Sequence, residues 1–124
     1  MPRRAAFLLI AAGLVSGCAS LAPPVLAPAP LRTPTPAEKD EARRLFVAPY
    51  IACMQTEVRK LGDSGVSGAA AVGAGELKCG HRIQELRRYG AAKDYDALRW
   101  SDYIEQVERE GRAAATTTGG NTRQ

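Results

Sequence analysis

Apolar residues recur at helical spacing in three stretches of the chain, and no stretch shows the alternation of a strand. The first stretch, residues 36–62, carries Ala42, Leu45, Phe46, Pro49, Tyr50, Cys53, Met54, Val58 and Leu61. The second, from about Glu76 to Tyr89, carries Leu77, Cys79, Gly80, Ile83, Leu86 and, just beyond it, Gly90. The third carries Ala97, Trp100, Ile104 and Val107, flanked by Tyr95, Leu98 and Tyr103. The pattern predicts a small all-α fold: a helical hairpin with a third helix packed across it.

Local signals predict where the first helix begins and where it bends. Thr35, Pro36 and Glu38 form the pattern of a capping box with proline at the first helical position. Pro49 lies inside the helix and is expected to kink or divide it near residues 47–48, because proline cannot donate the hydrogen bond that continues the helix.

Glycine and acidic residues predict the remaining boundaries. Residues 62–75, rich in Gly, Ala and Ser, are interpreted as a flexible connection in which residues 69–72 can already be helical. The third helix is expected to open at Lys93 or Asp94 and to end at Gly111. Gly80, beside Cys79, is expected to let two helix backbones approach closely.

The flanks of the helical part have a different composition. Residues 18–36 are rich in Ala and contain six prolines, namely Pro23, Pro24, Pro28, Pro30, Pro34 and Pro36. Such a tract favours extended conformations and, at roughly 3 Å per residue, would reach up to about 50 Å. We therefore expect a disordered, semi-rigid tether at 18–36, a helical domain at 37–111 and a disordered polar tail at 112–124.

The first 17 residues have the layout of a secretory leader. Arg3 and Arg4 precede an uncharged stretch, residues 5–15, which is too short for the ~20 residues of a membrane span. The run Val15-Ser16-Gly17-Cys18 that follows resembles the lipobox of bacterial lipoproteins. The resemblance covers only residues 1–20, and the alternative is an ordinary secretory signal in which Cys18 is incidental.

The resemblance implies where the protein is located and how it is attached there. The leader (residues 1–17) would be removed, and Cys18 would carry the lipid that attaches the protein to a membrane. Residue 19 is Ala rather than the Asp that retains such lipoproteins at the inner membrane. An outer-membrane location facing the periplasm is therefore favoured over the inner membrane.

Cys53 and Cys79 remain as a pair once Cys18 is assigned to the lipid. Because the periplasm is oxidising, a Cys53–Cys79 disulfide is expected, the alternative being two buried reduced cysteines. A bridge across about 26 residues would stabilise the fold by about 3–4 kcal/mol in the chain-entropy account. This is a large contribution for a domain whose core is small.

Charge and motifs give little support to catalysis or nucleic-acid binding. Without Arg3 and Arg4 the 17 basic residues become 15, against 13 acidic ones, which describes an ordinary mixed surface. The sequence Gly62-Asp63-Ser64-Gly65 resembles the nucleophile signature of chymotrypsin-like proteases. However, the single histidine, His81, follows the serine instead of preceding it, and the strands of that family are missing. We expect no enzyme activity, no cofactor and no metal site.

A candidate binding surface remains. Arg82, Arg87 and Arg88, beside His81, could contact anionic headgroups, cell-wall polymers or an acidic protein, although charge runs are usually solvated faces. Trp100 with Tyr103 could form an exposed aromatic anchor. A place in the core is the favoured interpretation of Trp100.

The expected function is a lipid-anchored periplasmic module that binds or scaffolds an envelope protein or a cell-wall polymer. The alternative is a small protein inhibitor of an envelope hydrolase such as lysozyme.

Overall fold

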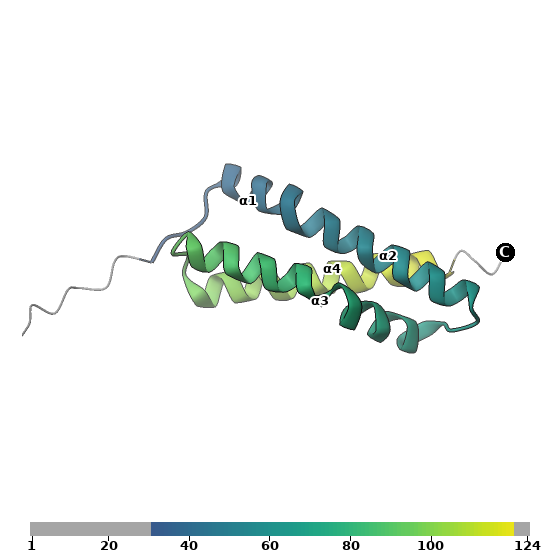
Figure 1. Ribbon diagram of the computed structural model, residues 1–124. Coiled ribbons are helices and arrows are strands. Elements are labelled where there is room, and N and C mark those ends of the chain that lie inside the picture. Colours follow the sequence, from purple (N-terminus) through teal and green to yellow (C-terminus); the bar gives the residue numbers. More distant parts are fainter. Residues whose placement is uncertain (1–30, 121–124) are drawn as a thin grey trace, which may run out of the picture.

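The chain folds into a bundle of three helical segments, each antiparallel to the next (Figure 1). The computed structural model describes residues 31–120; the expected leader, Cys18, most of the tether and residues 121–124 lie outside them. The first segment consists of α1 (Pro36–Ala42), a π-helical turn η1 (Arg43–Val47) and α2 (Ala48–Asp63). It is followed by α3 (Gly68–Ala92) and α4 (Ala97–Gly120). The predicted all-α class, a disulfide-stapled hairpin with a third helix, is confirmed.

The predicted capping box opens α1. The Thr35 hydroxyl accepts a hydrogen bond from the Glu38 backbone N–H at 3.2 Å, and the Thr35 N–H donates to the Glu38 carboxylate at 2.9 Å. Two backbone donors that a helix start leaves without partners are thereby satisfied.

The predicted division of the first segment coincides with η1. A regular helix would need a hydrogen bond from the nitrogen of Pro49 to the carbonyl of Leu45, which proline cannot donate. The backbone N–H of Ala48 instead reaches back five residues to the carbonyl of Arg43. The π-helical turn thus accommodates the missing hydrogen bond of Pro49 in the residues that precede it. In Figure 1, the α1 end of the segment stands away from α3 and α4.

Residues 32–35, here called the strap, cross the loop between α3 and α4. The Arg32 N–H donates to the Asp94 carbonyl at 3.1 Å, and the Asp96 N–H donates to the Arg32 carbonyl at 2.9 Å. The Arg32 guanidinium also binds the Glu38 carboxylate at 2.7 Å. The strap is therefore part of the bundle, although the sequence predicted a tether as far as residue 36.

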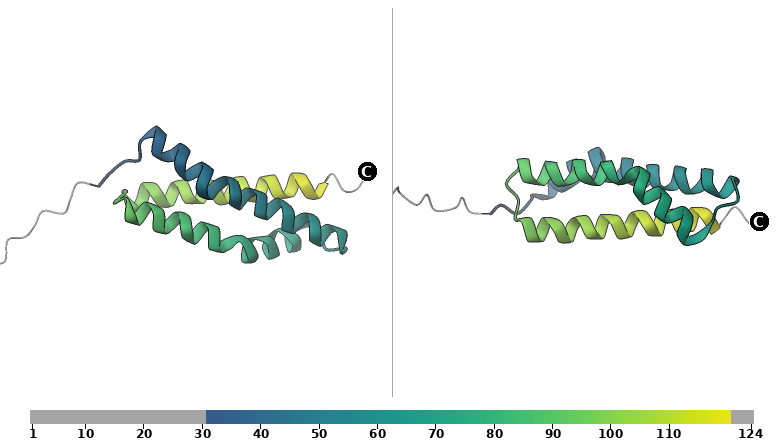
Figure 2. Two further views of the ribbon diagram at one scale, coloured as in Figure 1. Left: turned by 45° about the horizontal axis from the view of Figure 1, so that its top comes forward. Right: turned by 60° about the horizontal axis from the view of Figure 1, so that its bottom comes forward.

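The core lies along the whole bundle and is linked covalently near its middle. Its largest fully buried side chains are Tyr50, Met54, Leu86, Ile104, Val47, Val107 and Cys79. The predicted disulfide joins Cys53 of α2 to Cys79 of α3, with Cα atoms 5.9 Å apart. The views in Figure 2 show α3 alongside α4, with the first segment lying against the pair.

Two glycines bring helix backbones against aromatic rings. A Cβ at Gly90 would overlap the indole of Trp100, and a Cβ at Gly111 would overlap the ring of Tyr50. The prediction that Gly80 lets two helix backbones approach closely is wrong, because a Cβ at this position would meet nothing within 4 Å. The bridge between α2 and α3 needs no glycine beside Cys79.

Both long helices extend beyond their predicted limits. The connection before α3 is only residues 64–67, because residues 68–75 are helical rather than flexible. α4 continues through Gly111 to Gly120, so the predicted tail at 112–124 is helical as far as the structure describes it. Ala115 is fully buried there, which gives the extra turns a packing surface.

The start of α4 also lies later than predicted. It begins at Ala97 instead of Lys93 or Asp94, and the Asp96 carboxylate caps it by accepting hydrogen bonds from the next turn. Asp94 occupies the preceding loop with φ 56°.

Three leucines face solvent: Leu45 and Leu77, which were assigned to the predicted apolar stripes, and Leu98, which was expected to flank the third stripe. Leu77 is 89% exposed, Leu98 80% and Leu45 40%. Their helices bury neighbouring positions instead, including Ile83 and Leu86 on α3 and Trp100 and Ile104 on α4. The predicted stripes therefore contained the buried residues but also included positions that lie outside the buried faces.

Candidate functional site

Trp100 belongs to the core, in agreement with the favoured interpretation. It is 6% exposed, and its indole N–H donates to the Leu86 carbonyl at 3.1 Å. Tyr103 is half-buried against it, with ring centroids 4.9 Å apart. Phe46, Tyr89 and Tyr95 continue this aromatic cluster at the strap end of the bundle. Trp100 is therefore unavailable as a protruding anchor, and only Tyr103 is partly open.

The predicted basic residues do not form one surface. Arg82 is half-buried and pairs with Glu85 at 3.5 Å, whereas Arg87 and Arg88 are exposed. At about 100° per residue, Arg87 lies roughly 140° around α3 from Arg82, and Arg88 lies roughly 100° further on. The three guanidinium groups thus point in three directions, and a single ligand would not contact all of them.

The residues of the serine-protease resemblance have local structural roles. The Ser64 hydroxyl donates to the Lys60 carbonyl at 3.1 Å, at the end of α2. His81 is exposed, and its Nδ1 lies 3.1 Å from the carbonyl of Lys78 on the preceding turn. Among residues 31–120 there is no group of three side chains that could hold a metal ion. No helix in the same range is long and apolar enough to span a membrane.

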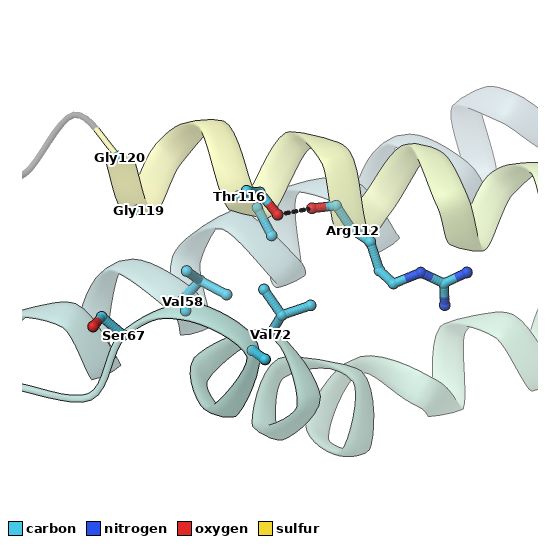
Figure 3. Close-up of a pocket in the computed structure, with 10 residues that line it drawn as sticks. Val58, Ser67, Val72, Arg112, Thr116, Gly119 and Gly120 are labelled. Carbon is cyan, nitrogen blue, oxygen red and sulfur yellow. Dashed lines mark hydrogen bonds between the residues drawn. The ribbon is translucent and has the colours of Figure 1, made fainter.

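An apolar groove of about 530 Å³ opens at the end of the bundle remote from the strap, and we call it the distal groove (Figure 3). Its walls come from the end of α2, the start of α3 and the last turns of α4. Its principal lining residues are Val58, Ala69, Val72, Ala115, Thr116 and Arg112. The groove forms because α3 begins at Gly68 and α4 continues to Gly120, the two extensions that the sequence did not predict.

Two polar side chains of the distal groove, Thr116 and Arg112, are already engaged. The Thr116 hydroxyl donates to the Arg112 carbonyl at 2.8 Å, so this donor is already satisfied by the helix backbone. The Arg112 guanidinium binds Glu76 at 2.7 Å, and this carboxylate raises the pKa of Arg112. In Figure 3 the guanidinium points away from Val58 and Val72. The groove therefore offers mainly methyl groups, which suits an apolar side chain of a partner more than catalysis.

A second hollow of about 460 Å³, which we call the proximal cleft, lies between the strap, α1 and α4. Its lining comprises Thr33, Pro34, Lys39, Arg99, Trp100, Asp102, Tyr103, Gln106 and Arg109. Only Trp100 and Tyr103 were singled out by the sequence. Arg99, Tyr103 and Gln106 stand at helical spacing, a usable signal, but nothing local indicated that Lys39 and the strap would lie opposite them.

Comparison with known proteins does not assign this bundle. We found no match to a protein family, to a curated protein or to a solved structure. The function is therefore argued from the two hollows and from the position of the strap.

Proposed function

We propose that this protein is a lipid-anchored binding or scaffolding module of the bacterial cell envelope. In this proposal the lipid on Cys18 holds it at the outer membrane, the helical bundle faces the periplasm, and it has no catalytic activity of its own. The lipobox-like run at residues 15–18 supports the anchor, and the Cys53–Cys79 disulfide suits an oxidising compartment.

The observation that carries the binding role is the placement of the strap and the distal groove at opposite ends of α4. Arg32 pairs with Asp94 and Asp96, immediately before α4 begins, whereas the groove is lined by residues 112–120 at its end. A helix of 24 residues is about 36 Å long. A chain tethered ahead of the strap would therefore present the groove on the side away from its anchor, where a partner can reach it.

The anchor is tested by mass spectrometry of the N-terminal peptide from host envelopes, together with fractionation of a Cys18→Ala variant. The proposal predicts a fatty-acylated peptide that begins at Cys18. It also predicts that the variant leaves the membrane fraction. A peptide that begins at residue 1, or that carries no acyl mass, would overturn the anchor.

The binding role is tested with a photoactivatable amino acid at Thr116, on the distal groove, and at Ala92, exposed at the other end of the bundle, as the control. Irradiation of intact envelopes should give a discrete adduct from Thr116 only. An Ala69→Arg change on the groove wall should abolish it. Equal adducts from both positions, or none, would refute the groove as the binding surface. Inhibition of lysozyme by the purified protein would favour the inhibitor alternative.

A further inference from the structure

We propose that the proximal cleft binds an acidic glycan of the cell wall, meaning linked sugar rings that carry carboxylate groups. The inference rests on the proposed envelope location and adds a ligand class to it. It concerns a site separate from the distal groove, at the opposite end of the bundle.

The charges of the proximal cleft favour an anion. Lys39, Arg99 and Arg109 line it against the single carboxylate of Asp102. Lys39 and Arg99 form no ion pair within the part of the chain that the structure describes; Arg99 instead donates to the Thr33 hydroxyl at 3.4 Å. Within residues 31–120, Arg109 has only a long contact with Glu105, at 3.9 Å, between two well-exposed side chains. A ligand carboxylate would therefore meet cations that have no strong competing partner.

The remaining lining suits a sugar ring. Tyr103 lies half-buried on α4 with the buried Trp100 behind it, and its open part offers an apolar aromatic surface against which the C–H face of a sugar can pack. The amide of Gln106 uses one donor for Glu110 at 3.2 Å, which leaves its carbonyl and second N–H for ligand hydroxyls. A hollow of this volume accommodates a small oligosaccharide.

The shape of the proximal cleft favours a glycan over a lipid surface as its ligand. A membrane is contacted by cations on an open face, such as the exposed Arg88 on α3. The proximal cleft is instead concave, with the strap as one wall and an aromatic residue in its lining. A discrete anionic ring system fits this geometry better than a plane of headgroups.

The inference is tested by fluorescence titration of the full chain, purified from host envelopes in a polyoxyethylene detergent. Trp100 is the only tryptophan, so its emission reports on the cleft without a label. One probe is the peptidoglycan disaccharide N-acetylglucosaminyl-N-acetylmuramic acid, and the other is the neutral N,N′-diacetylchitobiose, which lacks the carboxylate. We expect saturable binding of the acidic disaccharide and at least roughly tenfold weaker binding of the neutral one.

Matched double variants locate the site. Arg99→Gln with Arg109→Gln should weaken binding of the acidic disaccharide by roughly tenfold or more, whereas Arg59→Gln with Arg88→Gln removes the same charge on α2 and α3, away from both Trp100 and the cleft, and should leave it unchanged. The Lys39→Gln variant, on α1, is a second test of binding in the cleft, and its result does not depend on the contact of Arg99 with the strap. Circular dichroism checks that each variant is folded.

The inference would be overturned if Trp100 fluorescence showed no saturable change, or if both disaccharides bound with equal affinity. It would also be overturned if both double variants lost the same affinity for the acidic disaccharide. A fourth contrary outcome is binding to phosphatidylglycerol vesicles that needs Arg99 and Arg109 while the disaccharide does not bind. Loss of acylation at Cys18 does not alter this titration. Failure of the anchor is therefore distinguishable from failure of the cleft.

Discussion

Replacement of Gly90 by alanine should destabilise the bundle, although alanine is the better helix former. A Cβ at this position would overlap Nε1 and Cδ1 of Trp100. The indole cannot simply move away, because it donates to the buried carbonyl of Leu86 at 3.1 Å and packs between Tyr95 and Tyr103. Gly90 is therefore required by the indole that lies on it, not by its backbone conformation.

The magnitude follows from three effects. Overpacking of a tight core costs about 1–3 kcal/mol, and disruption of the indole hydrogen bond adds about 1 kcal/mol. The higher helix propensity of alanine returns about 1 kcal/mol. The expected net loss in the free energy of unfolding is therefore about 1–3 kcal/mol. A loss of about 2 kcal/mol lowers Tm by roughly 8–16 °C in a domain of this size.

The assay is equilibrium unfolding by guanidinium chloride and by heat, followed through far-ultraviolet circular dichroism and Trp100 fluorescence. Gly80→Ala, on the same helix, is the matched control, because its Cβ would meet nothing within 4 Å. It should stabilise the protein by about 0.5–1 kcal/mol through propensity alone. If Gly90→Ala is as stable as the wild type or as Gly80→Ala, the argument from close packing is refuted.

Three further predictions follow from the bridge and from the tyrosines. Cys53→Ser with Cys79→Ser should cost about 3–4 kcal/mol in the free energy of unfolding, and a reducing agent should lower the wild type by the same amount without affecting the variant. Tyr95→Phe should be neutral or stabilising, because its buried hydroxyl has no hydrogen-bond partner among residues 31–120, whereas Tyr89→Phe should be destabilising, because it loses the 2.8 Å bond to Glu41. Denaturation curves in which both variants behave alike would contradict this contrast. Burial raises the pKa of all four tyrosines, so the unfolded chain releases their protons more readily, and stability should be intact below about pH 10 and fall as the pH rises above it. Tyrosinate absorbance that appears well before alkaline unfolding would contradict that prediction.

Local chemistry determined much of the fold from the sequence. Thr35 and Glu38 are close in the chain, and their capping box needs nothing beyond the first helical turn. Pro49 interrupts a helix in any surroundings, so the division before Ala48 was predictable. Cys53 and Cys79 could be paired because apolar spacing placed both on inward faces and the inferred compartment is oxidising.

Contacts between distant segments decided the rest. Leu77 was assigned to the apolar stripe of its helix, but it lies about 160° around α3 from Cys79, and packing against α2 and α4 buries the Cys79 side. Gly111 reads as a helix end, yet the ring of Tyr50 lies against it and α4 continues to Gly120. The strap and both hollows join residues some sixty positions apart, as in the pairing of Arg32 with Asp94. A periodic pattern indicates the helix to which a residue belongs. Which helix or loop contacts each face of that helix is fixed only when the helices pack. The candidate sites could therefore be identified only in the tertiary structure.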